Sequence, residues 1–504
     1  MSTSASAPPD LRASRTDAAT GALSFVALFA IVCLLAGTAP DADLWGHLTF
    51  GRDIVRTGWV HTGDPYSFAS DRLWINHEWL AEVVMWSAYS RGGVAGLVAL
   101  KLLLACVAGI AFLETWRRHA LPPVWRDGML FVTAFGTWPL VSTMRPQAFS
   151  IACFAVLLLT LDRIRIGRTR WLFGLPIVFA VWVNVHGGWI VGAGVLAVFV
   201  ACSWCDPAWT PRDRRLLLAA ACASAAATLC NPYGLSMLGF LAETVRPARA
   251  DITEWQPVTR VPVIGLVLWL APTAVALHAV WRRGRAVALW PLLTVALLAV
   301  GSFRVIRLVG FYALAVGFLI APLTAPDAAD DVVRRVRPVS GWTWLRTAAT
   351  CVALVAIAVG TFGRTLAMDA DWLPEREAAV FVKTHDLSGR LLTWFNYGEY
   401  AIWHFSPALR VSMDGRRETV YSEEVRDRHW RIYNNQPEAV EEVARLDPDY
   451  VWLPASFPVV SRLEAAGWRP IFEGPRSVVL SRRTPRAISS AVSLATLDRV
   501  FPGP

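Results

Sequence analysis

The sequence has 504 residues, of which 55% are hydrophobic and only 17% are charged, and its formal net charge is +9. Soluble globular chains are about 45–50% apolar and about 25% charged, so this composition excludes a soluble enzyme, a disordered chain and a fibrous repeat. The apolar residues gather in many runs of about 20 residues, the length that crosses the hydrocarbon core of a bilayer. The sequence therefore predicts an α-helical polytopic membrane protein.

The first predicted element is a disordered cytoplasmic tail over residues 1–20, which is rich in Ser, Ala and Pro. A transmembrane domain over residues 21–366 follows, with eleven apolar stretches that we expect to span the membrane. They lie near residues 21–39, 93–113, 128–144, 146–161, 171–184, 188–205, 216–230, 261–280, 286–303, 307–324 and 342–363.

A polar loop over residues 40–92 separates the first two spans and is rich in Asp, Trp, His and Glu. Within it, residues 43–57 and 76–90 carry apolar side chains at helical spacing. Amphipathic stretches of this kind suit helices that lie on the membrane surface.

Short arginine-rich connections between the spans set the orientation of the chain. They occur at residues 117–118, 163–170, 212–215, 282–285 and 334–337. With eleven spans and a cytoplasmic N-terminus, all five fall on the cytoplasmic side, as the positive-inside rule requires. The same pattern accounts for the positive net charge without nucleic-acid binding. The 40–92 loop and the C-terminus then lie outside.

After the last span, residues 371–485 alternate strand-like runs with amphipathic stretches. The strand-like runs are 390–395, 409–413, 450–453, 470–472 and 477–480, and the amphipathic stretches include 437–446 and 457–467. This alternation predicts a small external α/β domain, followed by a C-terminal tail over residues 486–504.

Polar side chains beside the span ends fall on the external face of this topology. They are Asp41, Asp43, His77, Glu78, Arg145, Asn184, His186, Asn231, Arg304 and Arg307. Ionisable groups at membrane depth are costly and usually line a cavity or a pathway. His47 is four residues after Asp43, so the two share one face of a helix. The joint pattern predicts one external site with both carboxylates and arginines.

Each of these residues also has a purely structural interpretation, which stays open. Asp41 and Asp43 can cap a helix or be solvated in a loop. An isolated arginine such as Arg145 snorkels to the interface. A histidine such as His186 often bonds a backbone carbonyl, although the two following glycines permit a close approach of the backbone.

A lipid-linked sugar phosphate is a substrate that such a site could use. Arginines would neutralise its phosphate, because a guanidinium matches phosphate geometry with two hydrogen bonds. A carboxylate would deprotonate the acceptor hydroxyl, and the arginines would stabilise the charge on the departing phosphate. The rings of Trp45, Trp74 and Trp79 suit the apolar face of a sugar, and they suit interfacial anchoring equally well.

Six motifs carry a likeness to known proteins over roughly residues 20–480. They are DADLWGHL (41–48), NHEWL (76–80), RPQ (145–147), NVHGG (184–188), NPYG (231–234) and MDGR (413–416). With the order of one span, an external Asp-x-Asp loop, a many-span core and an external C-terminal domain, this pattern resembles the GT-C class of membrane glycosyltransferases. It is most similar to a bacterial family of GT-C-like membrane proteins.

The resemblance implies an enzyme of the bacterial inner membrane that moves a sugar from a polyprenyl-phosphate donor to an envelope lipid, glycan or protein. It implies that Asp43 is the catalytic base, with Asp41 as the second choice. It places Arg304 or Arg307, and Arg145, on the donor phosphate. His47, His77, Glu78 and His186 are the further candidates for contact with substrate.

A divalent metal ion, Mg or Mn, is left open by the resemblance, because only some members of the class need one. Asp41, Asp43, Glu78 and the nearby histidines are the candidate ligands, although their spacing is not a metal signature.

Two other functions remain open from the sequence. A transporter or flippase would carry a lipid-linked or anionic substrate, but transporters place polar groups near the bilayer midplane and often contain repeats, and neither feature is found here. A non-catalytic GT-C-like scaffold would serve envelope glycan assembly.

Residues 395–400 and 414–417 either bind the acceptor or hold the C-terminal domain on the membrane core.

Overall fold

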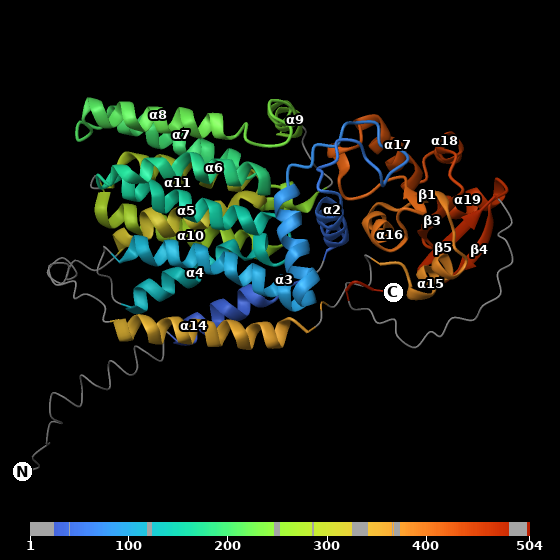
Figure 1. Ribbon diagram of the computed structural model, residues 1–504, viewed down its shortest axis with the longest axis horizontal. Coiled ribbons are helices and arrows are strands. Elements are labelled where there is room, and N and C mark those ends of the chain that lie inside the picture. The colour runs from blue at the N-terminus through green and yellow to red at the C-terminus, as the bar shows by residue number, and fades with distance from the viewer. Residues whose placement is uncertain are drawn as a thin grey trace, which may run out of the picture.

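The computed structural model describes residues 25–39, 41–117, 123–245, 252–284, 287–324, 341–364, 366, 373–482 and 501–503. A bundle of helices forms one part of the molecule and a small α/β domain forms the other, with the short helix α2 at the junction (Figure 1). The tail predicted at 1–20 lies outside the described residues.

The polar loop that follows the first predicted span contains the two helices that the sequence predicts. Helix α2 (Asp43–Thr57) ends at Gly58, whose φ of 73° lets the chain leave the helix in the left-handed conformation. Helix α3 (Trp79–Trp116) is broken at Gly93, where φ is 55° and ψ is −140°. The predicted surface stretch 76–90 and the predicted span 93–113 are therefore two arms of α3 that meet at this glycine, and the first arm begins at Trp79.

Besides α3, the bundle contains one helix before α2 and the helices that follow α3 in the chain. Their bounds are Phe25–Ala36, α4 (Pro123–Val141), α5 (Gln147–Arg165), α6 (Gly174–Val185), α7 (Trp189–Cys205), α8 (Pro211–Ala227), α9 (Ser236–Val245), α10 (Val263–Arg283), α11 (Leu289–Arg304), α12 (Val309–Ala315) and α14 (Gly341–Phe362). Helix α9 was not predicted. Residues 212–215, predicted as a basic link between spans, form the first turn of α8, which Thr210 caps.

Four helices in the described part of the chain are long and apolar enough to cross a membrane. They are Trp79–Trp116, Gln147–Arg165, Val263–Arg283 and Ile306–Thr324. Several other apolar helices are shorter, among them Thr169–Val185, Trp189–Cys205 and Leu289–Arg304. The polytopic helical fold is confirmed, and the count of eleven spans stays a prediction.

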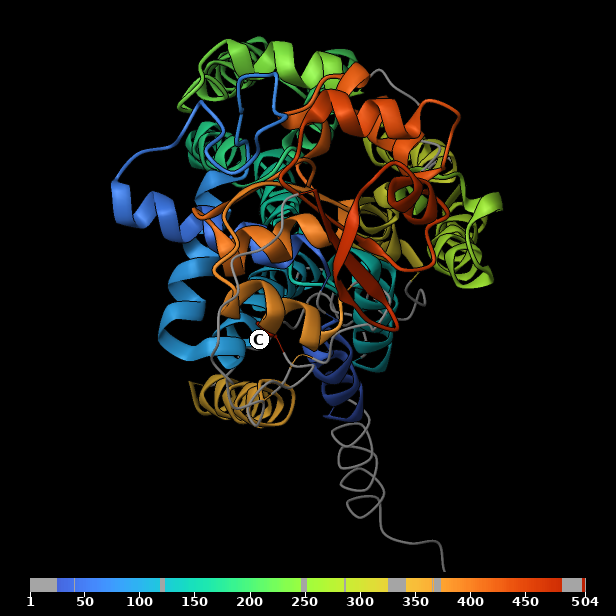
Figure 2. The same cartoon turned by 90° about the vertical axis from the view of Figure 1, so that its right-hand side faces the viewer.

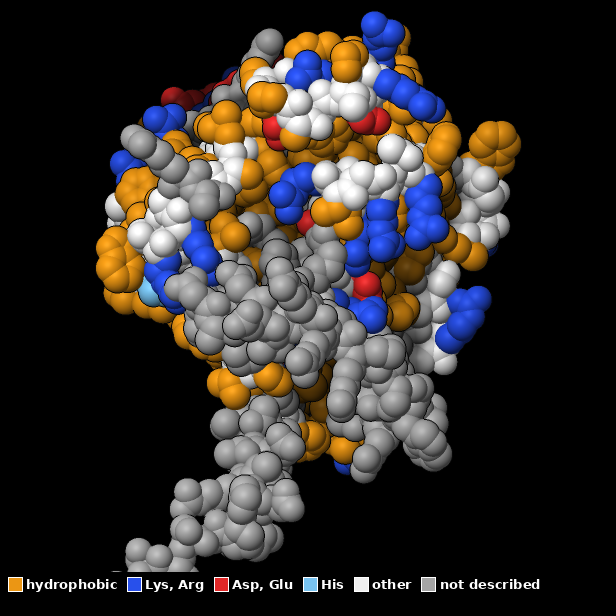
Figure 3. Space-filling model, turned by 90° about the vertical axis from the view of Figure 1, so that its left-hand side faces the viewer, with side chains coloured by type: hydrophobic (Ala, Val, Ile, Leu, Met, Phe, Trp, Pro, Cys, Tyr) orange, Lys and Arg blue, Asp and Glu red, His pale blue; other side chains and the backbone are white. Residues whose placement is uncertain are grey.

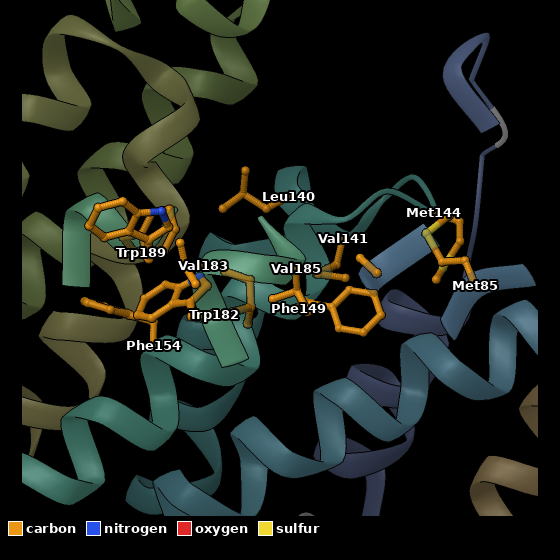
Figure 4. Packing of buried hydrophobic residues seen from close by; sticks show 14 of the residues in the cluster. Met85, Leu140, Val141, Met144, Phe149, Phe154, Trp182, Val183, Val185 and Trp189 are labelled. Carbon is orange, nitrogen blue, oxygen red and sulfur yellow. The ribbon is translucent and has the colours of Figure 1, made fainter. Parts of the chain in front are cut away.

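The bundle core is a layer of large apolar side chains between α4, α5, α6 and α7 (Figure 4). Phe154 and Trp182 are fully buried within it. A Cβ at Gly192 would lie 2.5 Å from the indole of Trp182, so this glycine allows α7 to pack closely on α6. The indole N–H of Trp182 donates to the hydroxyl of Ser150 at 2.7 Å. This bond fixes the end of α6 that precedes His186.

The two sets of helix ends differ in charge. Helices α5, α7 and α10 end near the basic stretches 163–170, 212–215 and 282–283, whereas their starts lie beside Arg145, His186 and the segment 252–262. Figure 3 shows basic side chains gathered on the end of the bundle opposite the α/β domain. The positive-inside rule predicts that such basic ends face the cytoplasm, and the orientation stays a prediction.

The C-terminal domain contains a five-stranded sheet in the order β2-β1-β3-β5-β4. Strand β1 (Gly389–Thr393) pairs in parallel with β2 (Leu409–Val411) and β3 (Tyr450–Pro454), and β5 (Ser477–Ser481) is antiparallel to β3 and to β4 (Arg469–Glu473). The helices are α15 (Arg376–Thr384), α16 (Gly398–Phe405), α17 (Glu423–Tyr433), α18 (Ala439–Leu446) and α19 (Val459–Ala465). All five strand-like runs of the sequence are strands here.

The polar loop that carries α2 and the C-terminal domain share one interface (Figure 2). Loop residues 66–68 lie beside β2, where Phe68 donates its N–H to Val411 and Val411 donates to Tyr66, both at 3.0 Å. The predicted C-terminal tail returns to this interface, because Phe501 is buried and packs 5.4 Å from the ring of Trp45. Residues 501–503 are therefore part of the packed structure.

Candidate functional site

Arg145 bridges the two aspartates of the Asp-x-Asp loop. Its Nε donates to Asp41, which is 1% exposed, and its Nη2 lies 2.9 Å from Asp43 Oδ2. The backbone N–H of Asp43 donates to Asp41 Oδ1 at 2.9 Å. The loop reaches this arginine because Ala39 donates its N–H to the carbonyl of Ser142 at 2.9 Å. Asp41 is locked in place, while Asp43, with its side chain 27% exposed, remains partly open.

A buried lysine supports the segments that carry this pair. Lys101 on α3 is 1% exposed and donates to the carbonyl oxygens of Gly37 and Val141, at 3.0 Å each. Gly37 follows the helix Phe25–Ala36, and Val141 is the last residue of α4. Helix C-termini carry partial negative charge, so the ammonium group stabilises both ends. The chain runs from these two ends directly to Asp41 and Arg145.

Glu254 connects Arg145 to a second arginine. It lies on the short helix η2 (Thr253–Trp255), with its two carboxylate oxygens 3.4 Å from Arg145 and 3.4 Å from Arg307. The guanidinium of Arg307 also lies 5.9 Å from the ring centre of Trp255. Arg304 is exposed and forms no ion pair with another residue that the structure describes. Of the two arginines predicted for the donor phosphate, Arg307 is the one that joins the cluster.

Glu78 lies among histidines from two elements. Its Oε1 is 3.6 Å from His77 Nε2 and 3.7 Å from His186 Nε2. Gly188 donates its backbone N–H to His186 Nδ1 at 3.0 Å, so the ring proton of neutral His186 is on Nε2 and faces Glu78. Ser150 lies 2.7 Å from the same Nδ1. Burial lowers the pKa of His186 to about 3, which keeps the ring neutral.

Charge connects the Glu78 group to the Arg145 group. Burial raises the pKa of Glu78, but the surrounding charges outweigh burial and hold its pKa below the ordinary value. The charged groups that lower it are His77, His47 and Arg307. His47 on α2 lies 3.1 Å from Glu82. Although burial lowers the pKa of His47, the hydrogen bond to Glu82 and the charges of Glu78 and Glu82 raise it to about 9.

The C-terminal domain contributes a carboxylate to the same site. Glu399 on α16 is buried, and its Oε2 accepts the backbone N–H of Gly46 at 3.0 Å. A Cβ at Gly415 would lie 2.3 Å from Asp43 Oδ1 and 2.7 Å from Glu399 Oε1, so only glycine fits between the two carboxylates. Burial and the charge of Asp41 raise the pKa of Asp43, and Arg145 opposes them.

Arg416 holds the C-terminal domain against the loop. Its guanidinium bonds Asp414 within its own turn and Asp64 in the loop, each with two hydrogen bonds of 2.7–2.9 Å. The same guanidinium lies within 5.4 Å of three aromatic ring centres, those of Phe50, Tyr66 and Trp74. The side chain is 5% exposed. Of the two interpretations of residues 414–417, the structure supports the one in which they hold the domain in place.

The structure brings most of the predicted site residues together. Asp41, Asp43, His47, His77, Glu78, Arg145, His186 and Arg307 form one connected group, and no ion pair among the described residues joins Arg304 to it. Sequence reasoning missed Glu254. It named the segments 395–400 and 414–417, which contain Glu399 and Gly415, but did not place either residue beside Asp43. Glu254 stands before a predicted span on the external side, so the rule that found Arg145 applies to it as well. No local pattern marks Glu399 or Gly415 as neighbours of Asp43.

The donor set does not fit a divalent metal ion in this arrangement. Among the described residues, no group of three or more His, Cys, Asp or Glu side chains is placed to hold one. Arg145 pairs with both Asp41 and Asp43, and a guanidinium on these oxygens competes with a cation for them. No step below depends on a metal.

Comparison with solved structures identifies the fold. The apo crystal structure of ArnT from Cupriavidus metallidurans is 13% identical, covers 92% of this chain and 98% of its own length, and has a TM-score of 0.51. The same protein bound to undecaprenyl phosphate is 12% identical over 95% of this chain and 100% of its own, with a TM-score of 0.50.

The apo oligosaccharyltransferase of Archaeoglobus fulgidus is also similar. It is 11% identical, covers 85% of this chain and 69% of its own length, and has a TM-score of 0.52. Sequence comparisons find no matching protein-family model and no matching curated protein. The structural neighbours are GT-C glycosyltransferases, so the predicted GT-C fold is confirmed.

Proposed function

We propose that this chain with the GT-C fold is a membrane glycosyltransferase that takes its sugar from a polyprenyl-phosphate-linked donor. The observation that carries the proposal is the grouping of two aspartates, Arg145 and Arg307 at one set of helix ends. The bound undecaprenyl phosphate in the ArnT structure supports the choice of a polyprenyl carrier.

Asp43 is the proposed catalytic base. It is the more exposed of the two aspartates, and it lies at the start of α2, where an acceptor hydroxyl can reach it. The acceptor oxygen forms a bond to the anomeric carbon, the bond from that carbon to the phosphate oxygen breaks, and the hydroxyl proton passes to Asp43. Asp41 acts through Arg145, which it orients.

The two arginines have different tasks in this proposal. Arg145 contacts three carboxylates, those of Asp41, Asp43 and Glu254, so its positive charge is already balanced and it positions Asp43. Within the described part of the chain, Arg307 forms an ion pair with Glu254 alone, at 3.4 Å, and its side chain is 24% exposed. We assign the donor phosphate to Arg307, whose charge would stabilise the departing phosphate.

His47, His77, Glu78 and His186 form the proposed sugar-binding side of the site. Their ring nitrogens and carboxylate oxygens can exchange hydrogen bonds with sugar hydroxyls. We place the site on the external face of a bacterial inner membrane, with the N-terminus in the cytoplasm and the C-terminal domain in the periplasm. The acceptor is an envelope lipid, glycan or protein.

The test is sugar transfer by the purified protein in liposomes, with a panel of radiolabelled polyprenyl-phosphate sugars and envelope extract as the acceptor source. Asp43→Asn is expected to abolish transfer while it retains donor binding. Asp206→Asn, at an exposed position beside the opposite end of α7, is the matched control and should transfer normally. Transfer that survives in Asp43→Asn would remove Asp43 as the base. Movement of labelled lipid across the bilayer without transfer would replace the enzyme by a transporter.

A further inference from the structure

Glu399 and Asp43 approach each other across the interface between the C-terminal domain and the loop. Asp43 begins α2, and Glu399 lies in the first turn of α16, which packs against α2. Both carboxylates lie within 2.7 Å of the position that a Cβ on Gly415 would occupy. The contact therefore depends on a glycine from a third segment.

Of the two carboxylates, Asp43 has a cationic side chain beside it and Glu399 does not. Asp43 has Arg145 at 2.9 Å. Glu399 accepts a neutral N–H from Gly46 and forms no ion pair with another described residue. The charged groups that face it are Asp41 and Asp43 on the loop side and Asp414 with Arg416 on the turn beside α16. The guanidinium of Arg416 is already bound to Asp414 and Asp64.

Two carboxylates at such close range, one buried and the other 27% exposed, do not both ionise, because their repulsion and their loss of hydration favour the state with one proton between them. The proton belongs on the carboxylate that lacks a cation. Burial, then Asp43 and Asp414, raise the pKa of Glu399 well above its ordinary value, in agreement with the geometry.

We propose that, of the two carboxylates in the Asp43–Glu399 pair, Glu399 carries the single proton. Asp43 then stays ionised and can act as the base of the site. The inference rests on the proposed function for the role of Asp43, and it makes Glu399 a positioning residue. A neutral Glu399 lets the C-terminal domain close over Asp43 without adding a second negative charge. The active base is then completed by two parts of the chain.

The proton can be detected without any transfer reaction. Infrared spectra of the purified full-length protein are expected to contain a carboxylic-acid C=O band near neutral pH that is lost in Glu399→Gln. Glu377→Gln, at an exposed position on α15, is the matched control and should keep the band. Asp43→Asn removes the partner charge that raises the pKa of Glu399. In this variant the band should therefore disappear at a lower pH than in the natural protein. A spectrum unchanged by Glu399→Gln would overturn the proposal.

The pH dependence of stability gives a second readout that a merely structural role would not change. A buried acid with a raised pKa holds its proton in the folded state after the unfolded state has lost it, so stability falls as pH rises above about 4.5. Glu399→Gln should therefore raise the thermal midpoint at pH 7, with a gain that vanishes toward pH 4.5. Parallel curves for the two proteins would contradict the shared proton.

These results can be separated from the fate of the proposed function. A band that depends on Glu399, in a protein that transfers no sugar, would support the pair and contradict the glycosyltransferase. Sugar transfer by a protein that lacks the band would do the reverse. Where both hold, Gly415→Ala, which separates the carboxylates, should lose transfer.

Discussion

Arg416 and Asp64 form a two-bonded ion pair, with contacts of 2.7 and 2.9 Å, between residues 352 positions apart in the chain. The pair joins the C-terminal domain to the loop that carries α2, and it is nearly inaccessible to water because both side chains are at most 5% exposed. Its position beside the Gly415 contact makes the geometry of the candidate site dependent on the docking of the two parts.

Loss of Arg416 should destabilise the whole assembly. In Arg416→Met, the carboxylates of Asp64 and Asp414 are left buried without a cation, which typically costs about 3–5 kcal/mol. We expect a clear fall in the thermal midpoint of the purified protein. Arg445→Met, at an exposed arginine of the same domain, should change the midpoint little, because its partner Glu442 keeps its ion pairs with Arg428 and Arg431. Equal midpoints for the two variants would show that Arg416 does not hold the interface.

Arg307 and Arg304 provide a matched pair for the donor phosphate. Arg307→Gln should weaken binding of a polyprenyl phosphate, because a charged hydrogen bond contributes about 1.5–3 kcal/mol, a factor of about ten or more. Arg304→Gln should bind almost normally, since this residue lies outside the cluster. Titration of each variant with a fluorescent polyprenyl phosphate measures the difference. A larger effect at Arg304 would reverse the assignment.

Lys101 should matter for transfer although it lies beneath the site. Lys101→Met leaves the carbonyls of Gly37 and Val141 without their donor and loosens the segments that present Asp41 and Arg145. Each unsatisfied buried group costs about 1–3 kcal/mol, so both the thermal midpoint and the transfer rate should fall. Leu103→Met, at an exposed position on the same helix, is the control. Normal transfer by Lys101→Met would separate the lysine from the site.

His47 should make stability depend on pH in the alkaline range. Its pKa is about 9 in the folded protein and about 6.5 in the unfolded chain. The resulting stabilisation is fully present below about pH 6.5 and is lost as pH rises through about 9. We expect the thermal midpoint to fall over this interval in the natural protein, and His47→Gln should flatten that part of the curve. A curve of the same shape in both proteins would count against a charged His47.

Phe501, near the end of the sequence, should stabilise the interface between the loop and the C-terminal domain. The indole N–H of Trp45 donates to the carbonyl of Pro502 at 2.8 Å, and His404 Nε2 donates to the same oxygen at 2.8 Å. Phe501→Ala empties a buried aromatic position, a change that costs about 3–5 kcal/mol in protein cores. Faster hydrogen exchange at the Trp45 indole is the expected result. Phe29→Ala, at an exposed position, should leave that exchange rate unchanged.

Local chemistry made much of the fold predictable. The bounds 43–57 for α2 follow from an acidic residue in the first turn and a glycine at the end, and both signals lie within the helix and its caps. The strands of the C-terminal domain follow from alternation in the sequence. Helix α9 was missed because it is a short helix that follows the turn-forming residues 231–234.

The predicted part of the candidate site came from one rule, that polar residues at external span ends converge. That rule placed Arg145 beside Asp43, which are 102 positions apart, because helix ends on one face are necessarily close. It could not place Glu399 or Gly415, since these come from a domain whose docking is decided by tertiary contacts such as that of Arg416 with Asp64. It also could not separate Arg304 from Arg307, because that difference depends on where the chain turns after α11.

The long sequence separations across the interface have a consequence for biogenesis. Trp45 and Pro502 are 457 positions apart, so α2 leaves the ribosome long before the residues that cover it. At about 5–20 residues per second, the loop waits roughly 20–90 s for its partners. Its aromatic side chains are uncovered during that time. The lipid headgroup layer attracts such rings, so we expect the membrane surface to shelter the nascent loop until the last residues have been made.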